Sequence, residues 1–377
     1  MIWVALFFTL CMAAYAAMVL WAAWNFSRLP CEHLSEAEVP MISVIIAARN
    51  EAAHIPILLE SLAAQNYPAE RFEVILIDDS SEDSTRAQAW LWTEHISQLR
   101  IIPSSPPPGT LAYKKAALST GIATAKGDII LQTDADCQMG PHWLESIAAH
   151  FGPNTALVSG PVLLTHESKW LERLQSLEMM GLVALGAGAM AAGKPNLVNG
   201  ANLAFRKDLF DHVGGYEGID QVASGDDELL LQKFRKAGSY EYRFARCKHA
   251  IVKTPALTDW ASLKSQRLRW VSKARYYQHR GPNVAQLVGF LAMLGVVVLL
   301  FLGLIESRWA LLAGELFLIK CLADLPLMYF SANFFHRLPL LKKDYLRLQL
   351  TYLPYVIWVG VAGNLVNTYE WKGRTVR

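Results

Sequence analysis

The apolar and polar positions between about residues 40 and 140 predict short strands separated by helices. Four apolar runs read as buried strands: 42–47, 72–77, 99–102 and 129–131. Between the first two, Ile55, Leu58, Leu59 and Leu62 recur at helical spacing, and "AYKKAALSTGIATAKG" reads as a helix closed by Gly127. Strands that alternate with helices favour a mostly parallel sheet covered on both faces, so we expect an α/β fold.

The N-terminal stretch is far more apolar than this region. "MIWVALFFTLCMAAYAAMVLWAAWNFS" carries no charged residue before Arg28 and exceeds the roughly 20 apolar residues that cross a bilayer. A cleaved signal peptide is the competing interpretation, but it requires a positive start and a shorter apolar core. We therefore interpret residues 1–27 as an uncleaved transmembrane anchor.

A second apolar region, residues 282–370, predicts two or three membrane helices. Residues 282–305 are uncharged, and candidates follow at about 309–330 and 348–368. Lys320 and Asp324 in the second candidate are spaced to pair on one helix face, which we interpret as a salt bridge rather than a catalytic group. The basic and apolar stretch "FFHRLPLLKKDYLR" is typical of an interfacial segment.

Composition narrows the function of the stretch between these ends, residues 40–277, which is long enough to fold as a globular domain. The 377-residue chain is 53% hydrophobic, yet its formal net charge is only +2, so we do not expect a nucleic-acid partner. The five cysteines are scattered, with no CxxC or Cys/His spacing. This argues against a zinc site and a disulfide scaffold and fits a reducing compartment.

Acidic residues follow two of the predicted strands. Asp78 and Asp79 end one strand, and Asp134 and Asp136 follow another. A single acidic pair is also typical of a solvated turn. In open α/β sheets, however, ligands bind beyond the carboxyl ends of the strands, where both pairs meet. Carboxylates there suit Mg²⁺ or Mn²⁺ on a diphosphate, with one Asp accepting from a pyrimidine N–H. We therefore expect a nucleotide-sugar site.

Further motifs occur in a fixed order from Ile42 to Trp270: "AARNE", "DDSS", "YKKAALSTG", "TDAD", "NGANLAFRK", "GGY", "SGDDELLLQKFRKAG" and "QRLRW". Together they resemble the GT-A catalytic domain of family 2 glycosyltransferases, the membrane-bound group of cellulose, chitin and hyaluronan synthases and ceramide glucosyltransferases. "TDAD" resembles the family's DxD metal motif and "QRLRW" its QxxRW motif. Two departures are minor: Asp226 stands where the family more often has Glu, and Ala47 where Pro is common.

The resemblance implies a role for each matched residue. Asp227 takes the general-base position, with Asp226 beside it, and Asp136 is the first metal ligand, with Asp134 next. Arg269 suits the diphosphate because its planar fork matches phosphate oxygens, and the Trp270 ring suits a sugar. The residues expected to contact the donor are Ala47, Arg49, Glu51, Asp78, Asp79, Lys114, Asp134, Asn202, Gln266, Arg269 and Trp270.

These roles predict an inverting, metal-dependent glycosyltransferase that moves a sugar from a nucleotide-diphosphate sugar, expected to be a UDP-sugar, to a membrane lipid or lipid-linked acceptor. A processive polysaccharide synthase, with a glycan acceptor, and a non-catalytic nucleotide-binding membrane scaffold are the alternatives. We expect a bacterial inner-membrane protein with a cytoplasmic catalytic domain. Three crossings after that domain would leave "WKGRTVR" outside, against the positive-inside tendency, so either the last apolar segment is re-entrant or the tendency fails.

Overall fold

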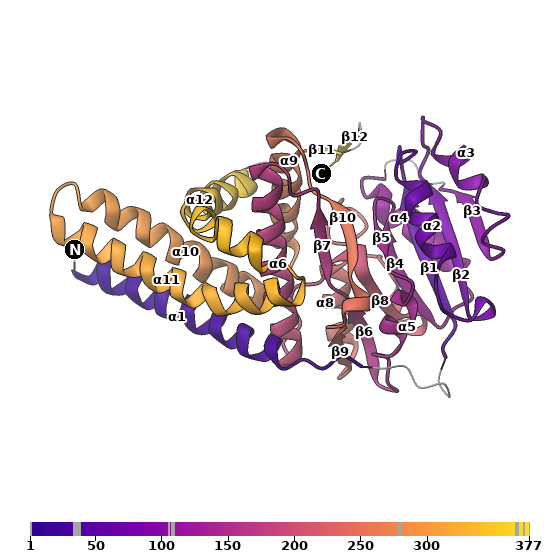
Figure 1. Cartoon of the computed structure of the whole chain (residues 1–377), viewed down its shortest axis with the longest axis horizontal. Coiled ribbons are helices and arrows are strands. Elements are labelled where there is room, and N and C mark those ends of the chain that lie inside the picture. Colours follow the sequence, from indigo (N-terminus) through magenta and orange to yellow (C-terminus); the bar gives the residue numbers. More distant parts are fainter. Residues whose placement is uncertain are drawn as a thin grey trace.

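A computed structural model describes residues 2–32, 39–104, 106, 110–277, 280–365, 369–371 and 374–376. Figure 1 shows an elongated molecule with long helices at one end and a sheet at the other. The N-terminus lies at the far end of the helices, whereas the C-terminal strands lie on the side of the sheet (Figure 1).

Within the described residues, seven strands form the main sheet in the order β3-β2-β1-β4-β8-β6-β9. The first four in this order are parallel, whereas β8 is antiparallel to both β4 and β6. The predicted α/β fold and its four strands are therefore confirmed. The bounds are β1 (Ile42–Ala48), β2 (Phe72–Asp78), β3 (Leu99–Pro103), β4 (Ile129–Asp134), β6 (Thr155–Ser159), β8 (Leu203–Arg206) and β9 (Glu241–Phe244).

Helices cover both faces of this sheet because successive residues of each strand point to opposite sides. Val44 and Ile46 of β1 pack with α2, whereas Ile45 packs with α4 and α8. The predicted apolar face of α2 is buried as expected. The domain helices are α2 (Ile55–Ala63), α3 (Thr85–Trp90), α4 (Tyr113–Ala123), α5 (Trp143–Ala148), α7 (Lys207–His212), α8 (Glu228–Ala237) and α9 (Trp260–Ser272), with 3₁₀ turns at Ala69–Arg71, Gly200–Asn202, Lys248–Ala250 and Lys273–Tyr276.

Two small sheets complete the strands. β5 (Gln138–Met139), β10 (Val252–Pro255) and β7 (Val162–Thr165) form one, with β10 in the middle. β11 (Tyr369–Trp371) and β12 (Arg374–Val376) form an antiparallel pair at the C-terminal end.

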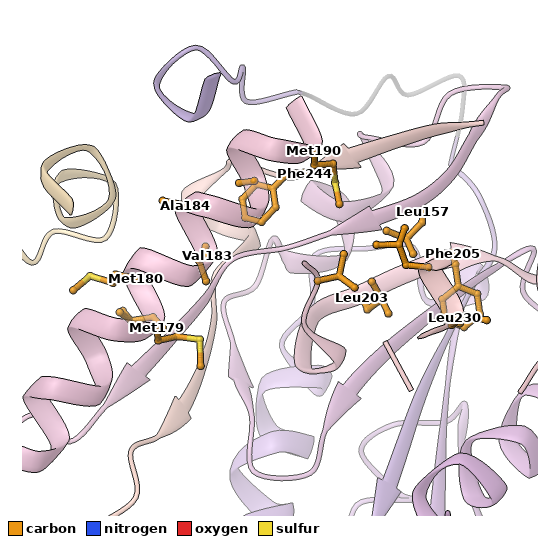
Figure 2. Close-up of a cluster of buried hydrophobic side chains, with 14 of the residues drawn as sticks. Leu157, Met179, Met180, Val183, Ala184, Met190, Leu203, Phe205, Leu230 and Phe244 are labelled. Atoms are coloured by element: carbon orange, nitrogen blue, oxygen red, sulfur yellow. The ribbon is translucent and has the colours of Figure 1, made fainter. Parts of the chain in front are cut away.

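One long helix was not expected from the sequence. α6 (Trp170–Ala191) lies between the sheet and the other long helices (Figure 1). Its buried side chains, among them Met179 and Val183, join the core that includes Phe205 of β8 (Figure 2). Its glycines permit close helix contacts, because a Cβ on Gly188 would overlap the backbone of Ala22. The apolar pattern alone did not separate this helix from a strand or a loop, since it lacks a polar face.

The remaining long helices are α1 (Ile2–Ser27), α10 (Arg280–Leu302), α11 (Ser307–Phe334) and α12 (Leu338–Leu365). In the described part of the chain, α1, α6 and residues 281–302 of α10 are long and apolar enough to cross a membrane. The sequence had separated an interfacial segment from a third membrane helix. The structure instead joins most of both into one helix, α12, which continues through a proline at position 354.

The expected pair in α11 is present. Lys320 Nζ lies 3.0 Å from Asp324 Oδ2. The Tyr15 hydroxyl of α1 donates to Asp324 Oδ1 at 2.7 Å, and the Gln349 amide of α12 donates to Asp324 Oδ2 at 3.2 Å. The pair therefore links three helices, which supports the structural interpretation over a catalytic one.

One pair of cysteines is joined, although the scattered spacing argued against a disulfide scaffold and fitted a reducing compartment. Cys31, a few residues after α1, is disulfide-bonded to Cys247, just before the 3₁₀ turn Lys248–Ala250, with their Cα atoms 4.9 Å apart. The two residues are separated by 216 positions, so no local spacing in the sequence pointed to the pair.

Candidate functional site

The carboxyl ends of three neighbouring strands bring the first motifs together. Ala48 of β1 lies opposite Asp78 of β2, and Ala47 lies opposite Asp134 of β4. The sheet register therefore places "AARNE", "DDSS" and "TDAD" at one edge, as the parallel order predicted.

Side-chain hydrogen bonds hold the "AARNE" and "DDSS" segments and the residues that follow them. Arg49 Nη1 donates to the Asp79 carbonyl at 3.0 Å, and its Nη2 donates to Glu82 at 2.8 Å. Asp78 Oδ1 accepts from the Ser81 amide at 3.1 Å. Glu51 is buried and accepts from the His54 ring at 2.7 Å. Much of this group is thus used to shape the loop rather than left open.

Asp79 differs from its neighbours because one of its oxygens lacks a partner. Oδ2 accepts from Arg374 Nη1 at 2.7 Å, whereas Oδ1 is buried without a hydrogen bond among the described residues. Burial raises the pKa of Asp79, although Arg374 and Arg49 oppose that shift. A buried acceptor without a donor is unusual in a folded protein and marks a place where a ligand N–H would fit.

Lys114 links the acidic motif after β4 to the acidic motif before α8. Its Nζ lies 2.7 Å from Asp134 Oδ1 and 3.1 Å from Asp226 Oδ2. Burial alone would lower the pKa of Lys114, but these two carboxylates raise it, so the ammonium stays charged. One cation on α4 therefore joins the end of β4 to the segment before α8.

Asp226 is a buried, ionised carboxylate. Gln132 of β4 donates to its Oδ2 at 2.6 Å, in addition to the contact from Lys114. Burial by itself would raise the pKa of Asp226, but the Lys114 charge and these hydrogen bonds hold it well below its usual range. Lys114 and Gln132 both contact the same oxygen of Asp226, its Oδ2.

Asp227 begins α8 as its N-cap. Its Oδ1 accepts from the Glu228 amide at 2.6 Å, and its Oδ2 accepts from the Gly200 amide at 3.2 Å. The helix start was expected from "SGDDELLLQKF", where acids favour the first turn. Unlike Asp226, this carboxylate is only partly buried.

Two lysines of the site were missed in the sequence. Lys115 is buried and donates to the carbonyls of Ile219, Val222 and Ser224 at 2.7, 2.8 and 2.9 Å. Its spacing from the buried positions 118 and 122 of α4 was the available signal, since it placed a lysine on an apolar helix face.

The second missed lysine is Lys273, just after α9. Its Nζ lies 3.6 Å from Asp227 Oδ1 and 3.1 Å from Glu228 Oε2. Burial would lower the pKa of Lys273, and these carboxylates raise it. Lys273 stands four residues after Arg269, on the same expected helix face, which was the signal that the sequence offered.

Asn202 does not present its amide to the site. Its Nδ2 donates to the Pro161 and Ala250 carbonyls at 3.0 and 2.8 Å, and its Oδ1 accepts from Trp143 Nε1 at 3.1 Å. The side chain is fully buried, so the expected donor contact gives way to a structural role that fixes β8 against its neighbours.

The two arginines of "QRLRW" have different environments. Arg267 is buried and lies 2.5 Å from Glu178 Oε2 of α6, while the Tyr355 hydroxyl of α12 accepts from its Nε at 2.7 Å. Its guanidinium also hydrogen-bonds the Gln266 side chain and lies 4.3 Å from the centre of the Trp270 ring. In the described part of the chain, the half-buried Arg269 guanidinium makes no hydrogen bond or ion pair.

The donor atoms at the end of β4 fit a hard divalent cation. Asp134 and Asp136 provide carboxylate oxygens, and neither is fully buried. No group of three or more His, Cys, Asp or Glu among the described residues could hold a metal by itself. Mg²⁺ and Mn²⁺ commonly bind through one or two carboxylates plus substrate phosphates, so these residues suit an ion shared with a substrate.

Comparison with known proteins agrees with the class of enzyme expected from the motifs. Residues 4–377 match the sequence family described as Glycosyl transferase family 21. The match confirms the glycosyltransferase class but names family 21, where the motifs had pointed to family 2.

Three curated relatives cover part of the chain. Glycosyltransferase AglE of Haloferax volcanii is 30% identical over 55% of this chain and 65% of its own length. The probable glycosyltransferase YdaM of Bacillus subtilis is 26% identical over 63% and 56% of the two chains. The beta-monoglucosyldiacylglycerol synthase of Synechocystis is 24% identical over 63% and 48%. The chain thus spans between about half and two thirds of these relatives.

A solved structure matches almost the whole fold. The mannosyltransferase PcManGT from Pyrobaculum calidifontis, in complex with GDP-Man and Mn²⁺, superposes with a TM-score of 0.60 at 19% identity, covering 96% of this chain and 97% of that one. At this identity the likeness establishes a shared GT-A fold.

Proposed function

Since this chain belongs to glycosyl transferase family 21, we propose that it transfers a sugar from a nucleotide-diphosphate donor to a membrane lipid acceptor, with a divalent metal and inversion at the anomeric carbon. The observation that carries this proposal is the Lys114 bridge between Asp134 and Asp226. It joins the expected diphosphate end of the site to Asp226, the residue next to the expected general base Asp227.

The donor would lie across the carboxyl edge of β1, β2 and β4. Asp79 would accept from the nucleobase, and Arg269 would face the diphosphate with Gln266 beside it. An arginine with no protein partner is suited to phosphate, because its fork matches two oxygens. The mannosyltransferase of similar fold was solved with GDP-Man, so both UDP- and GDP-sugars belong among the tested donors.

Asp136 and Asp134 would hold the metal. When bound, a divalent ion would offset the charge that develops on the leaving diphosphate. Lys114, already paired with Asp134, places a second positive charge beside the same oxygens. This pair would keep the Asp134 carboxylate oriented toward the donor.

Asp227 would accept the proton of the attacking acceptor hydroxyl. As the hydroxyl oxygen bonds to the anomeric carbon, the bond to the diphosphate breaks and the proton passes to the Asp227 carboxylate. The Gly200 and Glu228 amides fix that carboxylate, and Lys273 lies beside it. One direct displacement on the face opposite the leaving group inverts the anomeric centre.

A lipid acceptor is supported by relatives and by the helices. One relative is named as a beta-monoglucosyldiacylglycerol synthase, and another as an undecaprenyl-phosphate 4-deoxy-4-formamido-L-arabinose transferase of Aeromonas hydrophila. Trp270, on the helix that contacts α12, would then line the acceptor side.

The position of Arg374 bears on topology. It belongs to "WKGRTVR" and contacts Asp79 of the catalytic domain. We propose that α10 and the less apolar α11, which carries the Lys320–Asp324 pair, make the two crossings after that domain, and that α12 stays at the cytoplasmic surface. Arg173 of α6 holds Asp344 of α12 at 2.7 Å, in keeping with a helix that lies against the domain.

The test is an assay of the purified full-length protein against UDP- and GDP-sugars with a membrane lipid extract as acceptor. We expect metal-dependent release of nucleoside diphosphate together with one glycolipid of inverted anomeric configuration. Long polymer products would instead favour the processive alternative. Nucleotide binding without any transfer or hydrolysis would contradict the proposed enzyme.

A further inference from the structure

The C-terminal strands lie against the catalytic site although they follow the membrane-side helices in sequence. β11 and β12 pair through Tyr369 with Val376 and Trp371 with Arg374. β11 contacts α9, and Figure 1 shows the pair above the space between α9 and α4. We call residues 369–371 and 374–376 the C-terminal hairpin.

Arg374 is the contact between this hairpin and the edge of the sheet. Its Nη1 donates to Asp79 Oδ2 at 2.7 Å, and its Nη2 donates to the Asp79 carbonyl at 3.3 Å. Its guanidinium lies 4.0 Å from the centre of the Tyr113 ring, which begins α4. Only 17% of the Arg374 side chain and 3% of the Asp79 side chain are exposed, so this is a mostly desolvated, charge-assisted contact.

Two buried polar atoms near the ends of β2 and β3 have no partner among the described residues. They are Asp79 Oδ1 and Ser104 Oγ. Ser104 follows β3, and its amide donates to the Asp78 carbonyl at 2.9 Å, which keeps it beside the acidic pair. Leaving such groups unpaired costs free energy, and a ligand that offers an N–H and a carbonyl would satisfy both. A nucleobase edge has this pattern.

We infer that the C-terminal hairpin is one wall of the nucleoside pocket, and that Arg374 is a positioning residue that fixes Asp79 so that its unpaired oxygen accepts an N–H from the nucleobase. The inference rests on the proposed function, because it assumes a nucleotide donor. The geometry favours a wall over an inhibitory plug, since Arg374 engages Oδ2 and leaves Oδ1 without a partner.

The charges around Asp79 should make nucleotide binding depend on pH. Burial raises the pKa of this carboxyl; Arg374 and Arg49 lower it, and Asp78 raises it again. Only the ionised form offers both oxygens as acceptors. Loss of Arg374 therefore raises the pKa of Asp79 further, and nucleotide binding should weaken on acidification at a higher pH than in the wild type.

The experiment compares full-length wild type with Arg374→Ala and Arg374→Lys. UDP, GDP and inorganic pyrophosphate, each with Mn²⁺, are titrated by calorimetry across a pH series. Pyrophosphate reports on the diphosphate end without a base. Arg308→Ala is the matched control, because Arg308 is an exposed arginine that pairs with Glu306 between α10 and α11.

We expect Arg374→Ala to weaken binding of the accepted nucleoside diphosphate by about tenfold, the usual weight of a hydrogen bond to a charged group. Pyrophosphate binding and the control should stay within about twofold, and the donor KM should rise with kcat nearly unchanged. Arg374→Lys should recover part of the affinity, since it keeps the charge but loses the planar fork.

Three results would overturn the inference alone. Unchanged nucleotide affinity in Arg374→Ala would show that the hairpin does not shape the pocket. Tighter nucleotide binding would show that the hairpin blocks the pocket. An equal loss of pyrophosphate binding would show that the hairpin affects the whole site and not the nucleoside end alone. A wild-type protein that binds neither UDP nor GDP would overturn the proposed function itself.

Discussion

The proposed donor edge, where β2 and β4 end, and the contacts of α9 with α6 and α12 satisfy their charges in opposite ways. At the donor edge, Asp134 keeps 36% of its side chain exposed, and one oxygen of Asp79 has no hydrogen-bond partner among the described residues. Where α9 meets α6 and α12, Arg267 and Glu178 are nearly buried and bind each other and Tyr355. The first arrangement leaves carboxylate oxygens available to a ligand, whereas in the second the charged groups are already paired with each other.

The same difference is found within the single motif "QRLRW", where one arginine has a structural role and the other is available to a ligand. Arg267 and Arg269 stand two residues apart in "QRLRW", yet one joins α9 to α6 and α12 while the other makes no ion pair among the described residues. Buried ion pairs with complete hydrogen bonding hold helices in one arrangement. Arg269, which has no partner in the described part of the chain, is therefore the better candidate to contact a substrate.

Metal removal should have the largest effect, because it acts on the open donor edge. We expect EDTA to reduce transfer to background and Mg²⁺ or Mn²⁺ to restore it, since the carboxylates of "TDAD" and the diphosphate would share the ion. Release of nucleoside diphosphate measures this, and thermal unfolding with and without EDTA is the control. Full turnover in EDTA would contradict the metal assignment.

Asp227→Asn should come next, with transfer lowered by about 10²–10⁴, the usual contribution of a positioned general base. Asparagine caps helices as well as aspartate does, so α8 and the melting temperature should be preserved. Donor affinity, measured by calorimetry, should stay near wild type.

Retained turnover in Asp227→Asn would reduce Asp227 to a helix cap. Asp226 would be the next base to test, although its contacts with Lys114 and Gln132 make its replacement a change to the donor edge as well.

Lys115→Met tests a buried lysine near the donor edge whose hydrogen bonds are all made within the protein. Three buried carbonyls lose their donor, so we expect a loss of about 3 kcal/mol in the free energy of unfolding. The loop before Asp226 should also loosen, lowering kcat by about tenfold. Denaturant unfolding and steady-state kinetics measure the two effects.

Lys126→Met is the matched control for Lys115→Met, because Lys126 is exposed just beyond the same helix. Equal stability of the two variants would show that the three carbonyl contacts do not hold the loop.

Replacing each arginine of "QRLRW" by lysine should have the smallest effect on transfer. The two variants distinguish most clearly between a residue that binds the donor and a residue that holds helices together. Arg269→Lys should raise the donor KM by about fivefold without changing stability, because only the phosphate fork is lost. Arg267→Lys should lower the melting temperature and leave donor affinity near wild type. The reverse pattern would contradict the assignment of Arg269 to the donor and of Arg267 to the contacts between helices.

The predictable parts of the site were those whose partners are near in sequence or in strand order. The parallel strands placed "DDSS" and "TDAD" at one edge, and the acidic first turn of "SGDDELLLQKF" gave the Asp227 cap. Both follow from local chemistry and from the alternation of strands and helices.

The unpredicted parts depend on partners far away in the chain. Nothing near Arg374 indicates Asp79, and nothing near Cys31 indicates Cys247. α6 was missed because it is covered on nearly all sides and so shows no amphipathic period. Asn202 was assigned to the donor because sequence cannot show that a buried amide is already saturated.

The inner end of α1 has a consequence for the acceptor. Ala22 and Phe26 belong to the same core as Phe205 of the sheet, so α1 is built into the catalytic domain rather than tethered to it. If α1 spans the bilayer, Asp227 is held at a fixed height above the lipid surface. The height of the acceptor hydroxyl above the bilayer then selects the acceptor. A headgroup whose hydroxyl lies too low or too high does not reach the Asp227 carboxylate, whatever its chemical identity.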